Sequence, residues 1–158
     1  MQMEHFDHDV KHDQQEIIPF LRKALAATAF PLRLLASPWS PPGWMKVPSP
    51  AIAEKLEPMT MTGTSNPNGL IASPEVMSAW ALYISYFIDA YASHEIPIWA
   101  VTPQNEPEFA APWEACTYNA SFERDFIDGY LGPQLQKAHP EVYGDDLHVM
   151  MIMRSDHY

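Results

Sequence analysis

Cysteine is nearly absent from this sequence of 158 residues, which contains only Cys116. A single cysteine excludes an intrachain disulfide framework and argues against a cysteine-based zinc site. We therefore interpret Cys116 as a small buried apolar residue. A long apolar run is also missing, because the longest one, around Trp80 to Tyr91, is interrupted by Asp89. It is too short to span a bilayer, so no transmembrane segment is expected.

Basic residues are scarce as well. Nine Lys+Arg stand against twenty Asp+Glu, which gives a net charge of -11, and no Lys/Arg cluster occurs. Nucleic acid and an anionic membrane surface are therefore poor partners, whereas a neutral substrate suits this charge. The N-terminal stretch MQMEHFDHDVKHDQ has neither a basic n-region nor an apolar h-region, so it is not expected to be a signal peptide.

What the sequence does contain is an alternation of short apolar runs and amphipathic segments. With 47% hydrophobic residues, the chain is long enough for one domain with a sizeable core. Strands are expected at residues 32–36, 98–101 and 147–153, and helices from Pro19 to before Pro31, from Ser73 to before Pro97, and from Asn119 onward. This order is typical of parallel βαβ units.

The helix boundaries carry specific signals. Ser73 is expected to cap a helix with Pro74 at its first position. Asn119 reads as a second N-cap, although Asn119-Ala120-Ser121 is also a glycosylation sequon. Gly132-Pro133 is expected to kink or break that helix. In the first helix, the apolar side is expected to comprise Phe20, Ala24, Leu25 and Ala27.

Histidines gather near the N-terminus, where His5, His8 and His12 alternate with aspartates. Their spacing of three and four would place them on one face of a helix as metal ligands. Because the segment has no apolar stripe to fix such a helix, we favour a solvated loop and expect no metal site.

The stretch WAVTPQNEPEF, from Trp99 to Phe109, joins an apolar strand to a proline-stiffened turn. Glu106 follows the end of this strand. A carboxylic acid there is suited to protonate a leaving glycosidic oxygen, and the amide of Asn105 to hydrogen-bond a sugar hydroxyl. Asn105-Glu106-Pro107 resembles the acid/base signature of retaining glycoside hydrolases built on (β/α)8 barrels. An ordinary surface turn remains the alternative for these three residues alone.

A second stretch, SPWSPPGWMK, runs from Ser37 to Lys46 directly after an apolar strand. A rigid loop that presents two indoles at a barrel mouth explains it better than a polyproline ligand segment, which would sit in polar disordered sequence. The stretch closely resembles the strand-loop motif of the glucosylceramidase-like glycoside hydrolases of family 30. With the RDFIDGYLGP segment at 124–133, the resemblance covers nearly the whole chain.

The resemblance implies a fragment of a (β/α)8 TIM barrel, with three parallel strands and their crossover helices. A whole barrel needs about 250 residues. Residues 1–158 are therefore expected to form part of the catalytic domain, with N-terminal and C-terminal parts of the barrel missing.

The implied activity is that of a retaining β-glycosidase acting on a glucosyl lipid such as glucosylceramide. Glu106 would be the general acid and then the general base, Asn105 would bind the hydroxyl next to the anomeric centre, and Trp39 would wall the sugar subsite. Trp44 and Lys46 match the motif, either at the substrate or as braces of the loop. The second carboxylate would come from a later strand, since Glu108 and Glu114 share the loop of Glu106.

The family also implies a lysosomal or secreted location, an activator protein or membrane surface that presents the lipid, and no cofactor. Two alternatives stay open. A related barrel hydrolase, such as a β-1,6-glucanase or xylanase, would share the Glu106 motif and differ in its loops. The other alternative is a non-enzymatic remnant that binds sugar or a partner, or an incomplete gene model. A strand ending in Glu beyond Tyr158 in the transcript would restore the enzyme interpretation, and a stop codon there would remove it.

Overall fold

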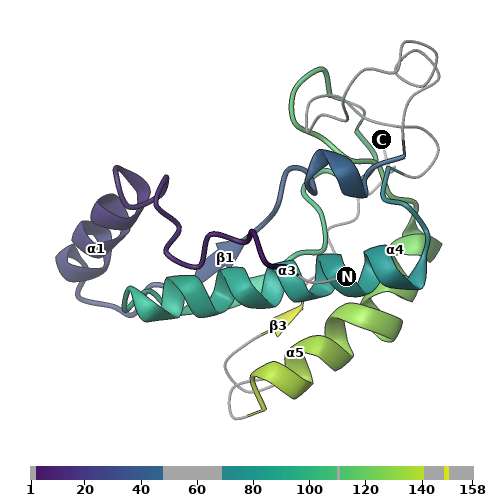
Figure 1. The fold of residues 1–158 in the computed structure, drawn as a ribbon. Coiled ribbons are helices and arrows are strands. Elements are labelled where there is room, and N and C mark those ends of the chain that lie inside the picture. Colours follow the sequence, from purple (N-terminus) through teal and green to yellow (C-terminus); the bar gives the residue numbers. More distant parts are fainter. Residues whose placement is uncertain (1–2, 48–68, 110, 141–147, 150–158) are drawn as a thin grey trace, which may run out of the picture.

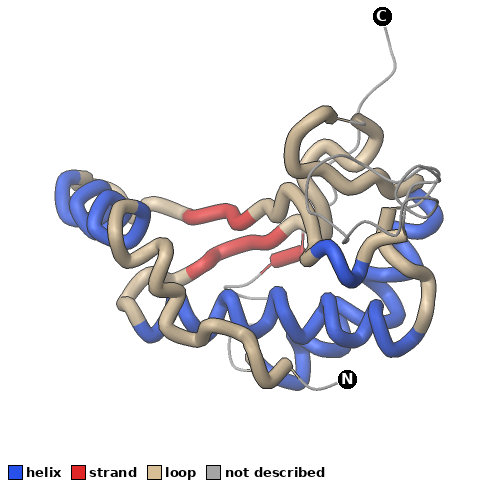
Figure 2. The backbone as a smooth tube through the Cα atoms, turned by 45° about the horizontal axis from the view of Figure 1, so that its top comes forward, coloured by secondary structure: helices blue, strands red, loops and turns tan. Residues whose placement is uncertain are grey.

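The computed structural model describes residues 3–47, 69–109, 111–140 and 148–149. In this part of the chain, three strands form one parallel sheet in the order β1-β2-β3. They are β1 (Leu34–Ala36), β2 (Ile98–Val101) and β3 (His148–Val149). Helices alternate with the strands along the chain, and the long helix between β1 and β2 lies below the sheet in Figure 2. The expected parallel α/β arrangement is confirmed.

The central strand is β2, which pairs with both neighbours. Leu34 lies opposite Ile98 and Ala36 opposite Val101, with an irregularity in register after Leu34. The first strand is shorter than the predicted 32–36, because its regular pairing with β2 begins only at Leu34. Of the third predicted strand, 147–153, only 148 and 149 lie within the described residues.

Helix α3 (Pro74–Ser93) is the longest described element and runs along one face of the sheet (Figure 1). It begins as predicted, since Ser73 Oγ accepts a hydrogen bond of 3.3 Å from the Val76 amide and Pro74 stands in the first turn. A proline there costs no hydrogen bond, because that N–H would have no partner in the helix. The side facing the sheet is buried, with Trp80 only 1% exposed.

A second helical stretch, from Ala120 to Ala138, packs on α3. It consists of α4 (Ala120–Phe126), the π-helical turn η2 (Ile127–Leu131) and α5 (Gly132–Ala138). Asn119 caps it as expected, with its Oδ1 accepting from the Phe122 amide at 2.8 Å. A kink or break was expected at Gly132-Pro133; the helical course is not broken there, but the π-turn interrupts its regular α-helical pattern directly before Gly132. Pro133 falls in the first turn of α5, directly after the π-turn, where a missing N–H is tolerated.

Helix α1 (Ile17–Ala27) stands at the amino-terminal end of the strands (Figure 1). Its buried side agrees only in part with the predicted one, since Leu25 packs against the buried cluster whereas Ala27 is exposed. Ile18 is 2% exposed and packs with Tyr91 and Ile96, whereas Phe20 is 69% exposed. The helix begins at Ile17, so Pro19 lies in its first turn, and Ile18, which precedes the expected start, supplies the most buried contact.

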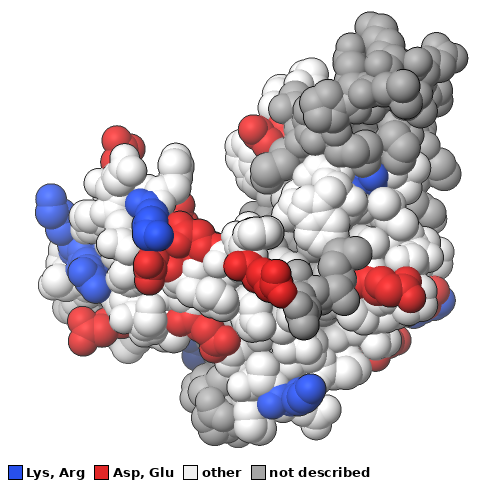
Figure 3. Space-filling view, viewed as in Figure 1, with Lys and Arg blue, Asp and Glu red and all other residues white. Residues whose placement is uncertain are grey.

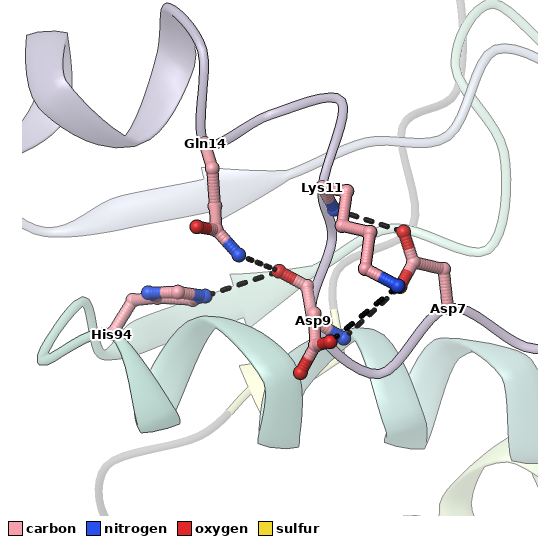
Figure 4. A network of polar contacts seen from close by, with 5 residues as sticks. All are labelled: Asp7, Asp9, Lys11, Gln14 and His94. Carbon is pink, nitrogen blue, oxygen red and sulfur yellow. Dashed lines mark hydrogen bonds and ion pairs between the residues drawn. The ribbon is translucent and has the colours of Figure 1, made fainter.

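The segment before α1 forms turns, as the solvated-loop interpretation predicted. It is fastened to the end of α3, since His94 Nε2 and Gln14 Nε2 both reach the Asp9 carbonyl oxygen, at 3.2 and 2.7 Å (Figure 4). The Lys11 ammonium lies beside Asp9 and Asp7. Within the described residues, no group of three or more His, Cys, Asp or Glu is placed to hold a metal ion.

The core lies between the sheet, α3 and the α4–α5 stretch, around Trp80, Val101, Phe126 and Leu135. The outer strand β1 is less covered, with Leu35 44% exposed. On the face drawn in Figure 3, Lys and Arg side chains are interspersed with Asp and Glu. Among the described helices, none is both long enough and apolar enough to cross a membrane.

Candidate active site

The candidate site lies on the two segments that leave the carboxyl ends of β1 and β2. These segments continue side by side beyond the strands, because the Thr102 amide donates to the Ala36 carbonyl at 3.0 Å and the Asn105 amide to the Pro38 carbonyl at 2.9 Å. The hydroxyls of Ser37 and Thr102 add a contact of 2.6 Å. Residues 36–39 and 102–105 are therefore two hydrogen-bonded segments, and the residues that follow each of them start from one connected support.

Glu106 directly follows the second of these segments. Its side chain is exposed, whereas Gln104 and Pro107 beside it are buried. Its backbone is left-handed, with φ of 44°. A non-glycine residue rarely adopts this conformation, which costs roughly 1 kcal/mol or more. The surrounding fold compensates, because the Glu106 carbonyl accepts from the Phe109 amide at 3.0 Å and the Pro107 carbonyl from the Tyr118 amide at 2.8 Å.

Asn105 and Trp39 meet through a buried glutamine that the sequence did not single out. Gln104 is 0% exposed, and its Nε2 donates to the Trp39 carbonyl at 2.7 Å and to the Asn105 carbonyl at 2.9 Å. The Trp39 indole itself is 54% exposed, and the Asn105 side chain is half-buried. The structure thus brings the backbones of Trp39, Asn105 and Glu106 together.

Trp44 occupies a different part of the same loop. It lies in the short 3-10 helix η1 (Gly43–Met45) and is 45% exposed. The segment that follows pairs with residues 69–71, through the Val47 amide on the Gly69 carbonyl at 2.8 Å and the Ile71 amide on the Met45 carbonyl at 2.9 Å. Trp44 is therefore held by this second pairing, and its assignment to the substrate stays a prediction.

Lys46 braces the loop from inside. It is 3% exposed, and its Nζ donates to the Ala115 carbonyl at 2.7 Å. Burial lowers the pKa of the Lys46 ammonium group. Cys116 lies next to it, is buried as predicted, and has its thiol pKa raised to about 12 by burial. The packing is tight, since a Cβ added at Gly69 would overlap Cys116 Sγ.

Two further aromatics follow Glu106 in the same loop. Phe109 and Trp113 are each 47% exposed, and their rings meet edge to face with 6.1 Å between centroids. The two rings form an exposed aromatic pair in the loop that carries Glu106. The sequence analysis did not single out these two residues. They lie in an irregular loop, which has no periodic pattern from which exposed and buried aromatic residues could be told apart.

Acidic side chains near Glu106 differ sharply in their surroundings. Glu108 and Glu114 are exposed and lie in the loop of Glu106, so neither ends another strand. Glu123 on α4 is 1% exposed, and its Oε1 has no hydrogen-bond partner among the described residues. Burial, and then the nearby Glu108 carboxylate, raise the pKa of Glu123 to about 7. Sequence reasoning missed Glu123, because a glutamate in the first turn of a helix is ordinarily solvated.

A cavity of about 270 Å³ lies away from these groups. It is lined by Ser37, Pro38 and Thr102 at the strand ends and by Trp80, Tyr83 and Ile84 on α3. Glu106, Asn105 and Trp39 do not line it. The lining is mainly apolar and comes from α3 and from the carboxyl ends of β1 and β2.

Comparison with known proteins identifies the family of the chain. The model of the glycosyl hydrolase family 30 TIM-barrel domain matches residues 1–156. Putative glucosylceramidase 3 of Caenorhabditis elegans is 38% identical over 144 residues, which cover 84% of this chain and 25% of that protein. The lysosomal acid glucosylceramidase of Mus musculus is 30% identical over 139 residues, covering 84% of this chain and 24% of that protein.

Among solved structures, an endo-β-1,6-glucanase superposes with a TM-score of 0.71 at 28% identity, over 89% of this chain and 28% of that chain. The chain thus spans about 25% of the length of the curated relatives named above. The family match extends over the strands, the Trp39 loop and the Glu106 turn alike. The chain therefore belongs to glycoside hydrolase family 30.

Proposed function

We propose that this chain carries the acid/base half of a retaining β-glycosidase that hydrolyses the β-glucosidic bond of glucosylceramide. Glu106 protonates the leaving glycosidic oxygen and then removes a proton from the attacking water. Asn105 hydrogen-bonds the neighbouring sugar hydroxyl, and Trp39 walls the sugar subsite, with Trp44 as a further substrate contact. No cofactor takes part in this chemistry.

The exposed Glu106 carboxyl at the end of β2 is the observation that carries the proposal. The fold holds the Glu106 backbone in a left-handed conformation, and backbone hydrogen bonds tie the segment before it to the Trp39 loop, so the point from which the carboxyl extends is fixed. General acid catalysis requires such fixing, because the proton must be delivered to one particular oxygen. The glucosylceramidases among the relatives support the choice of substrate.

The test is Glu106→Gln in the protein expressed from its complete coding sequence. Hydrolysis of substrates with poor leaving groups is expected to fall by about 100-fold or more, since these need the acid. Azide is expected to rescue part of the turnover of activated aryl glucosides, because it needs no general base to attack the glycosyl-enzyme intermediate. Unchanged activity on both substrate types would sink the assignment.

A β-1,6-glucanase activity is the second candidate, because a solved structure with that activity matches 89% of this chain. The two candidates share the Glu106 chemistry and differ in the substrate that the loops accept. Competition between a fluorescent glucosylceramide and a β-1,6-glucan oligosaccharide separates them, since the preferred substrate has the higher kcat/KM.

The glucosylceramide proposal extends to the setting of the protein. A lysosomal or secreted location and an activator protein or membrane surface that presents the lipid fit the lysosomal enzyme among the relatives. On this proposal, residues 1–158 form part of the barrel catalytic domain, and the nucleophile comes from another strand of that domain.

A further inference from the structure

Gln104 uses a single buried amide to hold both of the segments on which the proposed site stands. Its Nε2 carries two hydrogens, and both are engaged, one by the Trp39 carbonyl at 2.7 Å and one by the Asn105 carbonyl at 2.9 Å. The side chain is 0% exposed, so water does not compete for these bonds. Its donors are therefore fully committed to the two backbones.

The hydrogen bond from Gln104 to Trp39 extends the backbone pairing that begins between β1 and β2. The last backbone bond between the two segments is that of the Asn105 amide to the Pro38 carbonyl at 2.9 Å. The next acceptor along is the Trp39 carbonyl, which the Gln104 side chain takes. The side chain thus supplies the connection at the point where the main chain of Glu106 turns into its left-handed conformation.

The second bond bears directly on Glu106. The Asn105 carbonyl belongs to the peptide unit that also contains the Glu106 nitrogen, so holding the oxygen fixes the plane from which the φ of 44° departs. If that plane rotated, the Glu106 carboxyl would move with it. A shift of 1 Å at a reacting group is enough to cost about 100-fold in rate.

The other end of the amide shows that this arrangement has a cost. Gln104 Oε1 is buried and has no hydrogen-bond partner within the described residues. A buried unpaired acceptor costs about 1 to 3 kcal/mol. Turning the amide over would not help, because Oε1 would then face two carbonyl oxygens. The two donors therefore dictate how the side chain sits.

We propose that Gln104 is a positioning residue that sets the Glu106 carboxyl and the Trp39 segment relative to each other by donating to both backbones. This inference rests on the proposed function above for its catalytic consequence. Its structural part, the coupling of the two segments, has a readout that does not require activity.

The most informative variant is Gln104→Glu in the protein expressed from its complete coding sequence. The new carboxylate has no hydrogen to donate, so kcat/KM for an aryl β-glucoside is expected to fall about 10- to 100-fold at pH 7. Because a buried carboxyl has a raised pKa, it regains one proton and one donor as the pH falls. The deficit relative to wild type is expected to shrink toward pH 5. Gln136→Glu, on the exposed side of α5, is the matched charge control and leaves kcat/KM unchanged.

Gln104→Met removes the donors without adding charge and also removes the unpaired oxygen. In amide hydrogen exchange, it is expected to accelerate exchange at 102–109, where the Asn105 and Phe109 amides report on the turn, while α3 keeps its protection. Unaltered exchange in this segment would overturn the proposal even if the protein is a glycosidase. A kcat/KM deficit of Gln104→Glu that is the same at every pH would also overturn it.

The two proposals fail in different ways. If wild-type protein hydrolyses no β-glucoside while Gln104→Met still speeds exchange at the turn, the proposed function is wrong and the coupling role of Gln104 stands. If Glu106→Gln abolishes activity but neither Gln104 variant changes kcat/KM or exchange, the function stands and the role of Gln104 is wrong.

Discussion

At the scale of single residues, burial separates acids that the sequence cannot distinguish. Glu106 and Glu123 are both glutamates near the end of an element, yet Glu106 is exposed and Glu123 is 1% exposed. The difference arises because Glu123 lies in the first turn of α4, which packs into the core, and its neighbour Glu108 comes from the Glu106 loop. Contacts with residues that are distant in sequence therefore raise the pKa of the Glu123 carboxyl.

Glu123 is expected to make the protein less stable as the pH rises from about 4.5 to about 7. Its pKa is raised from the ordinary 4.5 to about 7 in the folded state, so folding favours the protonated form. The stabilisation that Glu123 contributes is fully present below its pKa in the unfolded chain. It is lost as the pH rises through its pKa in the folded protein. Glu123→Gln is expected to remove about 1 to 3 kcal/mol of this pH dependence.

Urea unfolding of wild type and Glu123→Gln at pH 4.5 and pH 7.5 measures the effect. Glu16→Gln, which neutralises an exposed carboxyl just before α1, serves as the control with the same change of charge. An identical pH dependence of the unfolding free energy in wild type and Glu123→Gln would show that the carboxyl is solvated.

At the scale of helices and strands, the sequence predicted correctly those features that depend only on residues close along the chain. The start of α3 at Pro74, the cap at Asn119 and the strand at 98–101 follow from side chains within four positions. The π-turn before Gly132-Pro133 and the burial of Ile18 in α1 were not predicted, because both depend on packing against α3. Gln104 gave no local signal, since its partner Trp39 is 65 residues away.

The N-cap of α3 is the element contact that is simplest to test. Ser73 Oγ accepts from the Val76 amide at 3.3 Å, so Ser73→Ala leaves that amide without its cap. A loss of about 1 kcal/mol in unfolding free energy is expected. Ser78→Ala, at an exposed position within α3, is the matched control and should be neutral or slightly stabilising. Chemical denaturation measures both, and Ser73→Asn should restore most of the loss.

At the scale of the whole molecule, the sheet is the decisive feature. The described part of the chain holds three strands, whereas a closed barrel has eight. The outer strand β1 leaves Leu35 44% exposed. Open apolar edges favour association with other chains.

Residues 1–158 on their own are therefore expected to be sticky, marginally stable and without glycosidase activity. A lone acid without its partner carboxylate does not form the glycosyl-enzyme intermediate. Incubation with an activated aryl β-glucoside and with fluorescent glucosylceramide in detergent, from pH 4 to 7, measures this. Turnover that Glu106→Gln abolishes would reveal a nucleophile within the chain, with Glu108 and Glu114 as the first residues to replace. Sequencing the transcript beyond Tyr158 complements this assay, since a downstream strand ending in Glu would supply the second catalytic carboxylate.

The left-handed backbone of Glu106 also bears on how such a protein changes over generations. Asparagine or glycine adopts a φ of 44° at a lower free energy than glutamate does. On the proposed function, a gene copy that no longer needed to hydrolyse its substrate would gain stability by replacing Glu106 with asparagine or glycine. On the same proposal, the need for hydrolysis is what would keep a glutamate at position 106.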